Sequence, residues 1–133
     1  MIRVVADTHA VLWYLYNDAR LSATALAFMD SIEQAGDQIA ISSIALAEMV
    51  YLIEKGKIAA TAFERVVAVL EKANATLVEV PFDRTIADAM RQIDRTQVPD
   101  LPDRIVTATA MQWGVPVISR DRKIRSSVVT TIW

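Results

Sequence analysis

Two carboxylates follow apolar segments that are predicted to be short strands. Asp7 comes directly after residues 2–6, and Asp121 comes just after residues 115–119. In a parallel sheet, both positions lie at the carboxyl-terminal edge, where α/β proteins bind their ligands. Structural roles are open for both residues as well. Asp7 is a good helix N-cap, and Asp121 could balance the charges of Arg120 and Arg122 in a turn.

Glu48 lies in a segment, residues 44–53, whose remaining nine residues are all apolar or aromatic. A helix that is apolar all round is buried. An isolated carboxylate in such a helix costs several kcal/mol of stability unless something compensates its charge. An arginine, a raised pKa or a metal ion could supply that compensation. A buried ion pair is therefore the structural alternative to a functional role.

Asp103 is predicted to open a helix just after Pro102, near the same edge of the sheet. Proline in the first turn and an acid near a helix N-terminus are both common for structural reasons alone. Asp100 is a competing candidate as a turn or cap residue. Spacing ranks Asp103 only slightly ahead, because it is closer to the expected start of the helix.

The four carboxylates Asp7, Glu48, Asp103 and Asp121 could converge at one edge of the sheet. Carboxylates that share a pocket repel one another, and divalent cations remove that cost. Oxygen ligands favour Mg²⁺ or Mn²⁺ over zinc. Such ions polarise phosphoryl groups and activate water, which is the chemistry of phosphodiester hydrolysis.

The elements that must position these residues are short strands alternating with longer helices. Strands are predicted at 2–6, 38–42, 76–80, 115–119 and 128–132, and helices at 8–16, 22–35, 43–55, 61–74, 83–94 and 103–113, with a loop at 96–102. This alternation predicts an α/β fold, a parallel-sheet α/β/α sandwich in a single domain over residues 1–133.

Composition excludes several classes of protein. The chain has 133 residues, 53% of them hydrophobic, so it is not a disordered tail. Cysteine is absent, which excludes disulfide scaffolds, thiolate metal sites and cysteine nucleophiles. A single histidine, His9, excludes a two-histidine ribonuclease mechanism within one chain.

Charge and hydropathy limit the partners. The net charge is −2, so a nucleic acid would need a local basic patch or bound metal ions. No apolar run approaches the roughly 20 residues that span a bilayer, and the first residues lack the features of a signal peptide. We therefore expect no membrane association and a cytoplasmic location.

Four stretches of the sequence, taken in order, resemble the PIN-domain family, and within it the VapC-type toxins of toxin–antitoxin pairs. They are residues 7–13 (DTHAVLW), 41–48 (ISSIALAE), 100–106 (DLPDRIV) and 117–121 (VISRD). Each stretch alone is a weak signal. All four in the right order over 133 residues are specific.

This resemblance implies a PIN-like fold and a Mg²⁺- or Mn²⁺-dependent endoribonuclease that hydrolyses RNA phosphodiester bonds. The implied catalytic and metal-binding residues are Asp7, Glu48, Asp103 and Asp121, with Ser119, Thr8 and Asp100 in supporting roles. Proteins of this type usually form homodimers and are silenced by a cognate antitoxin. An antitoxin and a second copy of the chain are therefore the expected protein partners.

Basic residues beside the acidic positions are the candidates for RNA contacts. Arg120, Arg122, Lys123 and Arg125 surround Asp121, and Arg104 follows Asp103. Contact with phosphates would make binding weaken steeply with salt. The alternative is a solvated loop whose charges are balanced by nearby acids. His9 is assigned no role.

The main alternative function is a catalytically silent PIN-like module that binds RNA or a protein, although the intact acidic set argues against it. A dehalogenase-like phosphatase would need a second aspartate two residues after Asp7, where His9 stands. A serine hydrolase would need a G-x-S-x-G motif, which the sequence lacks.

Overall fold

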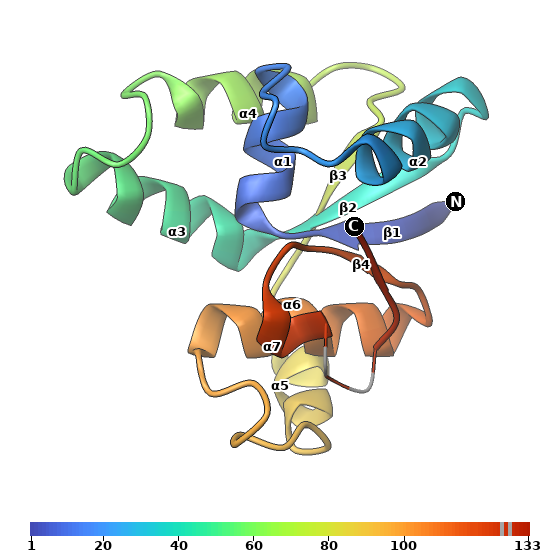
Figure 1. The fold of residues 1–133 in the computed structure, drawn as a ribbon, viewed down its shortest axis with the longest axis vertical. Coiled ribbons are helices and arrows are strands. Elements are labelled where there is room, and N and C mark those ends of the chain that lie inside the picture. Colours follow the sequence, from blue (N-terminus) through green and yellow to red (C-terminus); the bar gives the residue numbers. More distant parts are fainter. Residues whose placement is uncertain (126, 128) are drawn as a thin grey trace.

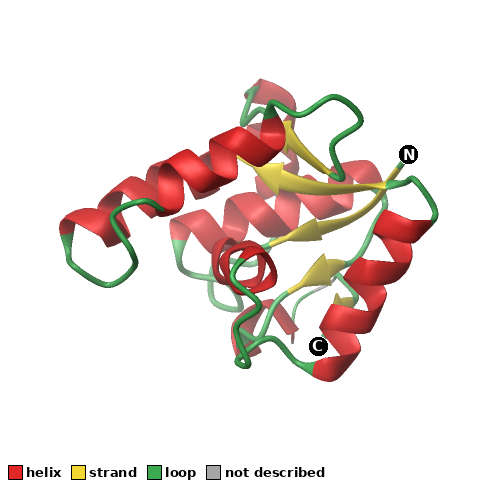
Figure 2. Ribbon diagram, turned by 90° about the horizontal axis from the view of Figure 1, so that it is seen from above, coloured by secondary structure: helices red, strands yellow, loops and turns green. Residues whose placement is uncertain are grey.

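Five parallel strands form one sheet between layers of helices in the computed structural model, which describes residues 1–125, 127 and 129–133 (Figure 1, Figure 2). The strands are β1 (Ile2–Ala6), β2 (Gln38–Ser42), β3 (Leu77–Val80), β4 (Val117–Ile118) and β5 (Thr131–Ile132). The helices are α1 (Thr8–Leu15), α2 (Ala23–Gln34), α3 (Ser43–Glu54), α4 (Ala62–Leu70), α5 (Arg84–Met90), α6 (Leu101–Trp113) and α7 (Arg122–Arg125).

The α/β/α sandwich predicted from the sequence is confirmed. Successive residues of β1 point to opposite faces of the sheet, as the pleat of a strand requires. Val4 and Ala6 pack in one core with α1, α2, α3 and α4, whereas Val5 packs in a second core with α5 and α6. Figure 1 shows α1, α2 and α4 on one side of the strands and α5, α6 and α7 on the other.

The strand order β3-β2-β1-β4-β5 places a topological switch point between β1 and β4. After β1, the chain adds β2 and β3 on one side of β1, and then adds β4 and β5 on its other side. Ala6 pairs with Ile118, and the backbone N–H of Asp7 donates to the Ile118 carbonyl at 3.1 Å. The ends of β1 and β4 therefore lie side by side, and ligand sites of open α/β sheets form at such points.

Several boundaries differ from the predictions. The helix expected at 103–113 begins at Leu101, because Asp100 is its N-cap and accepts a hydrogen bond from the N–H of Asp103 at 3.3 Å. Pro102 thus falls in the first turn, where its missing N–H costs nothing. The helices expected to reach 74 and 94 end at Leu70 and Met90.

The C-terminal part also departs from the predictions. The short helix α7 was not predicted, and β4 and β5 have only two residues each. Val128, where the last strand was expected to begin, lies outside the described residues. None of the described helices is both long and apolar enough to cross a membrane.

Met49 and Val50 provide a test of which face of α3 is buried. Met49 is fully buried, whereas its neighbour Val50 is 42% exposed. We expect Met49→Ala to lower the free energy of unfolding by about 2–5 kcal/mol, because it leaves a cavity in the core that positions α3. Val50→Ala should cost less than about 1 kcal/mol. Urea denaturation measures both values, and equal losses would contradict this orientation of α3.

Candidate active site

A cavity of about 420 Å³ opens where the chain leaves β1 and β4. Its lining comes from α1, α3, the start of α6, the segment after β4 and the loop that carries Arg20. The lining residues are Asp7, His9, Trp13, Arg20, Glu48, Asp100, Asp103, Arg120 and Asp121. The structure thus brings together all four carboxylates singled out in the sequence, and adds Asp100 to them.

Asp7 acts as a helix cap and as part of this cavity. One of its carboxylate oxygens accepts a hydrogen bond from the N–H of Ala10 at 2.9 Å, which caps α1. Burial raises the pKa of Asp7, against the opposing effects of the Ser119 hydroxyl and the Ala10 N–H. The structural and the functional interpretation of Asp7 are therefore compatible.

Glu48 forms no ion pair with a lysine or arginine that the structure describes, and the positive charge that lowers its pKa is that of His9. Its carboxylate instead accepts a hydrogen bond from the hydroxyl of Thr8, which is buried, at 2.5 Å. Burial raises the pKa of Glu48, the Thr8 bond opposes that shift, and the charges of Asp100 and Asp7 add to it. The buried ion pair that was the alternative for this residue is not formed, and Thr8 orients the carboxylate.

Asp103 lies among the other carboxylates of the cavity, and their negative charges act on it. Burial raises its pKa to about 7, with further contributions from the negative charges of Asp121, Asp100, Glu48 and Asp7. A shift of this kind is typical of functional carboxylates. Asp100 is exposed and caps α6, and it also lines the cavity beside Asp103.

Asp121 lies at the start of α7. One of its carboxylate oxygens accepts hydrogen bonds from the N–H groups of Lys123 and Ile124 at 2.8 and 3.2 Å. The backbone N–H of Asp121 donates in turn to the hydroxyl of Ser119, which is fully buried, at 3.0 Å. Ser119 therefore fixes the segment after β4 and also lies against Asp7.

The donor set indicates which metal the cavity suits. In the described part of the chain, no three His, Cys, Asp or Glu side chains converge closely enough to hold one ion directly. The carboxylates nevertheless line one cavity, and the negative charges of the other four add to the raised pKa of Asp103. Mg²⁺ keeps several of its waters and binds through one or two carboxylates, whereas zinc uses a compact set of nitrogen and sulfur ligands. The residues present therefore fit a hydrated, oxygen-bound ion.

Of the basic residues predicted to contact RNA, one lines the cavity and the others do not. Arg120 lines the cavity, whereas Arg122, Lys123 and Arg125 form α7 and are not among its lining residues. Arg104 turns away from it. Its guanidinium donates to the carbonyls of Met90 and Ile93 at 3.0 and 3.4 Å, at the end of α5. These bonds give Arg104 a structural role, and the phosphate contact expected of it stays a prediction.

Two further cavity residues, Arg20 and Trp13, were not predicted to belong to the site. The guanidinium carbons of Arg20 and Arg120 lie 5.1 and 4.7 Å from the ring centroid of Trp13. These are cation–π contacts, and the one made by Arg120 joins residues more than a hundred positions apart in the chain. Arg20 follows α1 in a loop with no motif around it, so nothing in the sequence alone indicated its position.

The chain is similar in sequence and in fold to several known proteins. The ribonuclease VapC22 of Mycobacterium tuberculosis (strain ATCC 25618 / H37Rv) is 27% identical over 126 residues, covering 95% of this chain and 92% of that protein. The VapBC2 structure from Rickettsia felis, bound to a promoter DNA fragment, aligns with a TM-score of 0.70 at 17% identity, over 98% of this chain and 97% of that one.

A toxin–antitoxin complex from Klebsiella pneumoniae aligns with a TM-score of 0.64 at 23% identity, over 98% of this chain and 96% of that one. At such identities these two structures show a shared fold. The family model for the PIN domain matches residues 4–127, nearly the whole length. The chain therefore belongs to the PIN domain family.

Proposed function

We propose that this protein is a divalent-metal-dependent endoribonuclease and the toxin of a VapBC-type toxin–antitoxin pair. The observation that carries the proposal is the set of five carboxylates around one cavity, in which the pKa of Asp103 is raised to about 7. Such a cluster is costly unless cations occupy it. The likeness to the ribonuclease VapC22 supports RNA as the substrate.

Asp7, Asp103 and Asp121 are the carboxylates that would hold Mg²⁺ or Mn²⁺. When bound, the ion supplies charge stabilisation of the phosphoryl oxygens and a more acidic water. Glu48, oriented by Thr8, is placed to accept a proton from the attacking water, because its raised pKa brings it closer to neutrality. Arg120, held over Trp13, lies at the cavity to neutralise a phosphate.

The proposed protein partners rest on the similar solved structures and on exposed apolar residues of α3. The similar solved structures include the VapBC2 complex of Rickettsia felis and a toxin–antitoxin complex of Klebsiella pneumoniae. We propose a cognate antitoxin for this chain on that basis. A homodimer is proposed as well, with Val50 and Tyr51, the exposed apolar residues of α3, as candidates for burial in one of these interfaces.

Cleavage of RNA by the purified chain tests the proposed function. We expect cleavage of a broad RNA pool with Mg²⁺ or Mn²⁺, and none with EDTA. Asp103→Asn should lower the rate by about 10²-fold or more, the effect typical of losing one group that stabilises transition-state charge. Gel electrophoresis of the products gives the rates.

Asp88→Asn is the matched control, because Asp88 is an exposed aspartate of α5 that pairs with Arg91. Its rate should equal that of the unmodified chain. Cleavage that persists in EDTA would contradict the metal-dependent mechanism. RNA binding without any cleavage would favour the catalytically silent module.

The pH dependence of stability tests the electrostatics of the cavity. An unfolded aspartate has a pKa of 3.8, whereas Asp103 in the folded chain has a pKa of about 7. Between these values the folded state binds more protons than the unfolded state, so stability falls as the pH rises. In EDTA, we expect the melting temperature to decrease from pH 5 to pH 8.

The same experiment, repeated on Asp103→Asn, isolates the contribution of Asp103 to the pH dependence of the melting temperature. Asp103→Asn should remove part of the decrease and raise the melting temperature at pH 8, because the amide cannot become charged. Mg²⁺ should stabilise the unmodified chain more at pH 8 than at pH 5. An identical pH dependence in both proteins would show that Asp103 does not carry the repulsion.

A further inference from the structure

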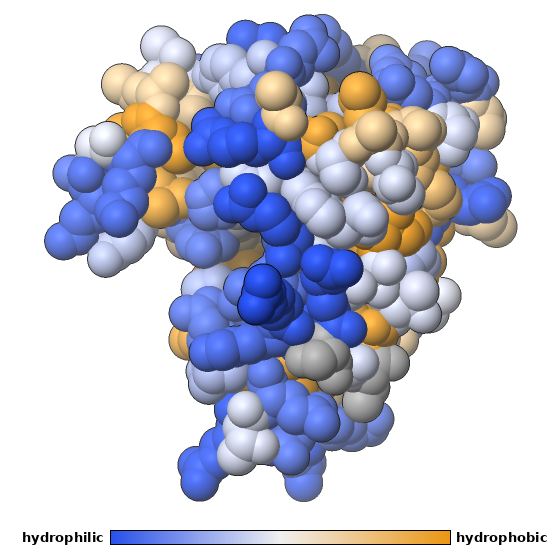
Figure 3. Space-filling model, in the orientation of Figure 1, coloured by the Kyte–Doolittle hydropathy of each residue, from blue (hydrophilic) through white to orange (hydrophobic). Residues whose placement is uncertain are grey.

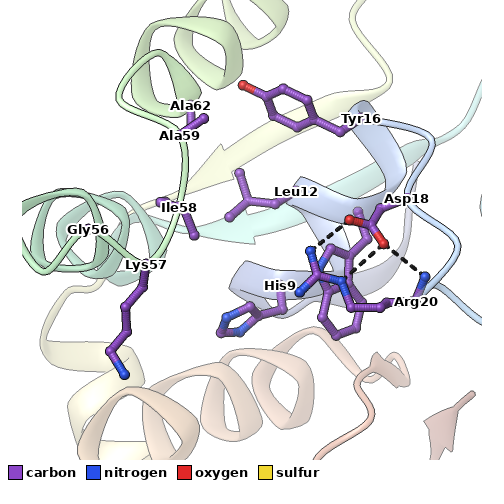
Figure 4. A pocket seen from close by; sticks show the side chains of 11 residues that line it. His9, Leu12, Tyr16, Asp18, Arg20, Gly56, Lys57, Ile58, Ala59 and Ala62 are labelled. Carbon is purple, nitrogen blue, oxygen red and sulfur yellow. Dashed lines mark hydrogen bonds and ion pairs between the residues drawn. The ribbon is translucent and has the colours of Figure 1, made fainter.

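A second cavity, of about 360 Å³, adjoins the acidic one (Figure 4). It lies between α1, the loop that carries Asp18 and Arg20, and the segment from Gly56 to Ala62 that joins α3 to α4. His9, Trp13 and Arg20 line both cavities. The two cavities are therefore neighbours that share these three side chains.

The second cavity combines an apolar wall with cationic groups. Leu12, Ile58 and Ala59 contribute to the wall, and the side chains of Arg20 and Lys57 reach its rim from opposite sides in Figure 4. Its volume falls within the range of cavities that hold small organic groups. This composition differs from that of the acidic cavity, where carboxylates dominate.

Arg20 is held in place before any ligand arrives. Its Nε and Nη2 donate to the two carboxylate oxygens of Asp18 at 3.0 and 2.7 Å, while the guanidinium lies over Trp13. Trp13 is only 6% exposed, so it acts as a support and not as a stacking surface for a ligand. This arrangement leaves Nη1 of Arg20 to bind an incoming group, with little side-chain entropy left to lose.

Lys57 adds positive charge to the second cavity, and Arg120 adds positive charge to the acidic one. Neither forms an ion pair with any residue that the structure describes. The surface in Figure 3 shows hydrophilic side chains gathered over the region of α7, with apolar atoms exposed near α3 and α4. A nucleic acid strand matches this surface, because its phosphates carry negative charge and its bases are planar groups that can pack against an apolar wall.

We propose that the second cavity binds one unpaired nucleotide of the RNA, next to the phosphodiester that lies at the acidic cavity. Its base rests against the wall formed by Leu12, Ile58 and Ala59, and Arg20 and Lys57 bind the flanking phosphates. This inference rests on the proposed function and adds to it a subsite for one base, which an unpaired nucleotide fills without the cost of leaving a duplex.

Lys57→Gln and Ala59→Phe test the two halves of this site. Lys57 and Ala59 are exposed, so neither substitution disturbs the core. Ala59→Phe places a large side chain in the cavity, whereas Ala60→Phe places the same side chain on the next residue, which does not line it. Arg91→Gln, directly after α5, is the control for Lys57→Gln, since it removes an exposed positive charge far along the chain.

The readout is the affinity for a fluorescein-labelled, single-stranded RNA octanucleotide, measured by anisotropy at several salt concentrations. All variants carry Asp7→Asn, and EDTA is present, so neither metal binding nor cleavage affects the result. We expect Lys57→Gln to raise Kd about 3- to 10-fold and to reduce the slope of log K against log salt by about 0.7. Ala59→Phe should raise Kd about tenfold without changing that slope. Both control variants should bind as the parent does.

Two outcomes would overturn the proposal. One is an octanucleotide that does not bind the parent chain. The other is binding that neither Lys57→Gln nor Ala59→Phe weakens, which would leave the cavity to a segment of a protein partner. Loss of the nuclease activity alone would not produce either outcome, because binding is measured without metal. The failure of the proposed function and the failure of the nucleotide site are thus distinguishable.

Discussion

The site depends on one constraint, which is the energetic cost of burying several mutually repelling carboxylates at one edge of the sheet. Asp7, Glu48 and Asp103 all have raised pKa values, and burial is the largest cause for each. No lysine or arginine ion pair compensates Glu48 in the described structure, and only the neutral hydroxyls of Thr8 and Ser119, the Ala10 N–H and the charge of His9 oppose the raised pKa values of Asp7 and Glu48. A fold that kept these charges together without a cationic ligand would lose stability for no gain.

The parallel sheet makes this arrangement possible. Pairing of β1 with β4 brings the residues after both strands together, although more than a hundred positions separate Asp7 from Asp121. The helices after the switch point then supply the remaining parts. The N-cap of α1 fixes Asp7, the buried face of α3 aligns Glu48 with Thr8, and the cap of α6 places Asp103 in the first turn.

The sequence was sufficient to predict the sandwich and the four principal acids, because both depend on local signals. Short apolar strands, the helices between them and an acid inside an apolar helix are each visible in a short window. The roles of Arg20, Trp13 and Arg104 were not visible in this way. Arg104 binds carbonyls at the end of α5, and Arg20 meets Trp13 only through the path of a loop, so both depend on tertiary packing. The start of α6 was misplaced because Asp100 and Asp103 are both plausible caps, and only the geometry distinguishes them.

Binding of Mn²⁺ to the purified chain, followed by electron paramagnetic resonance and calorimetry, tests the central claim most directly. The account predicts binding at neutral pH that weakens at least about tenfold in Asp7→Asn and in Asp121→Asn, while the exposed control Asp88→Asn binds as the unmodified chain does. Absence of binding, or equal binding by all four proteins, would contradict the assignment of the acidic cavity as a metal site.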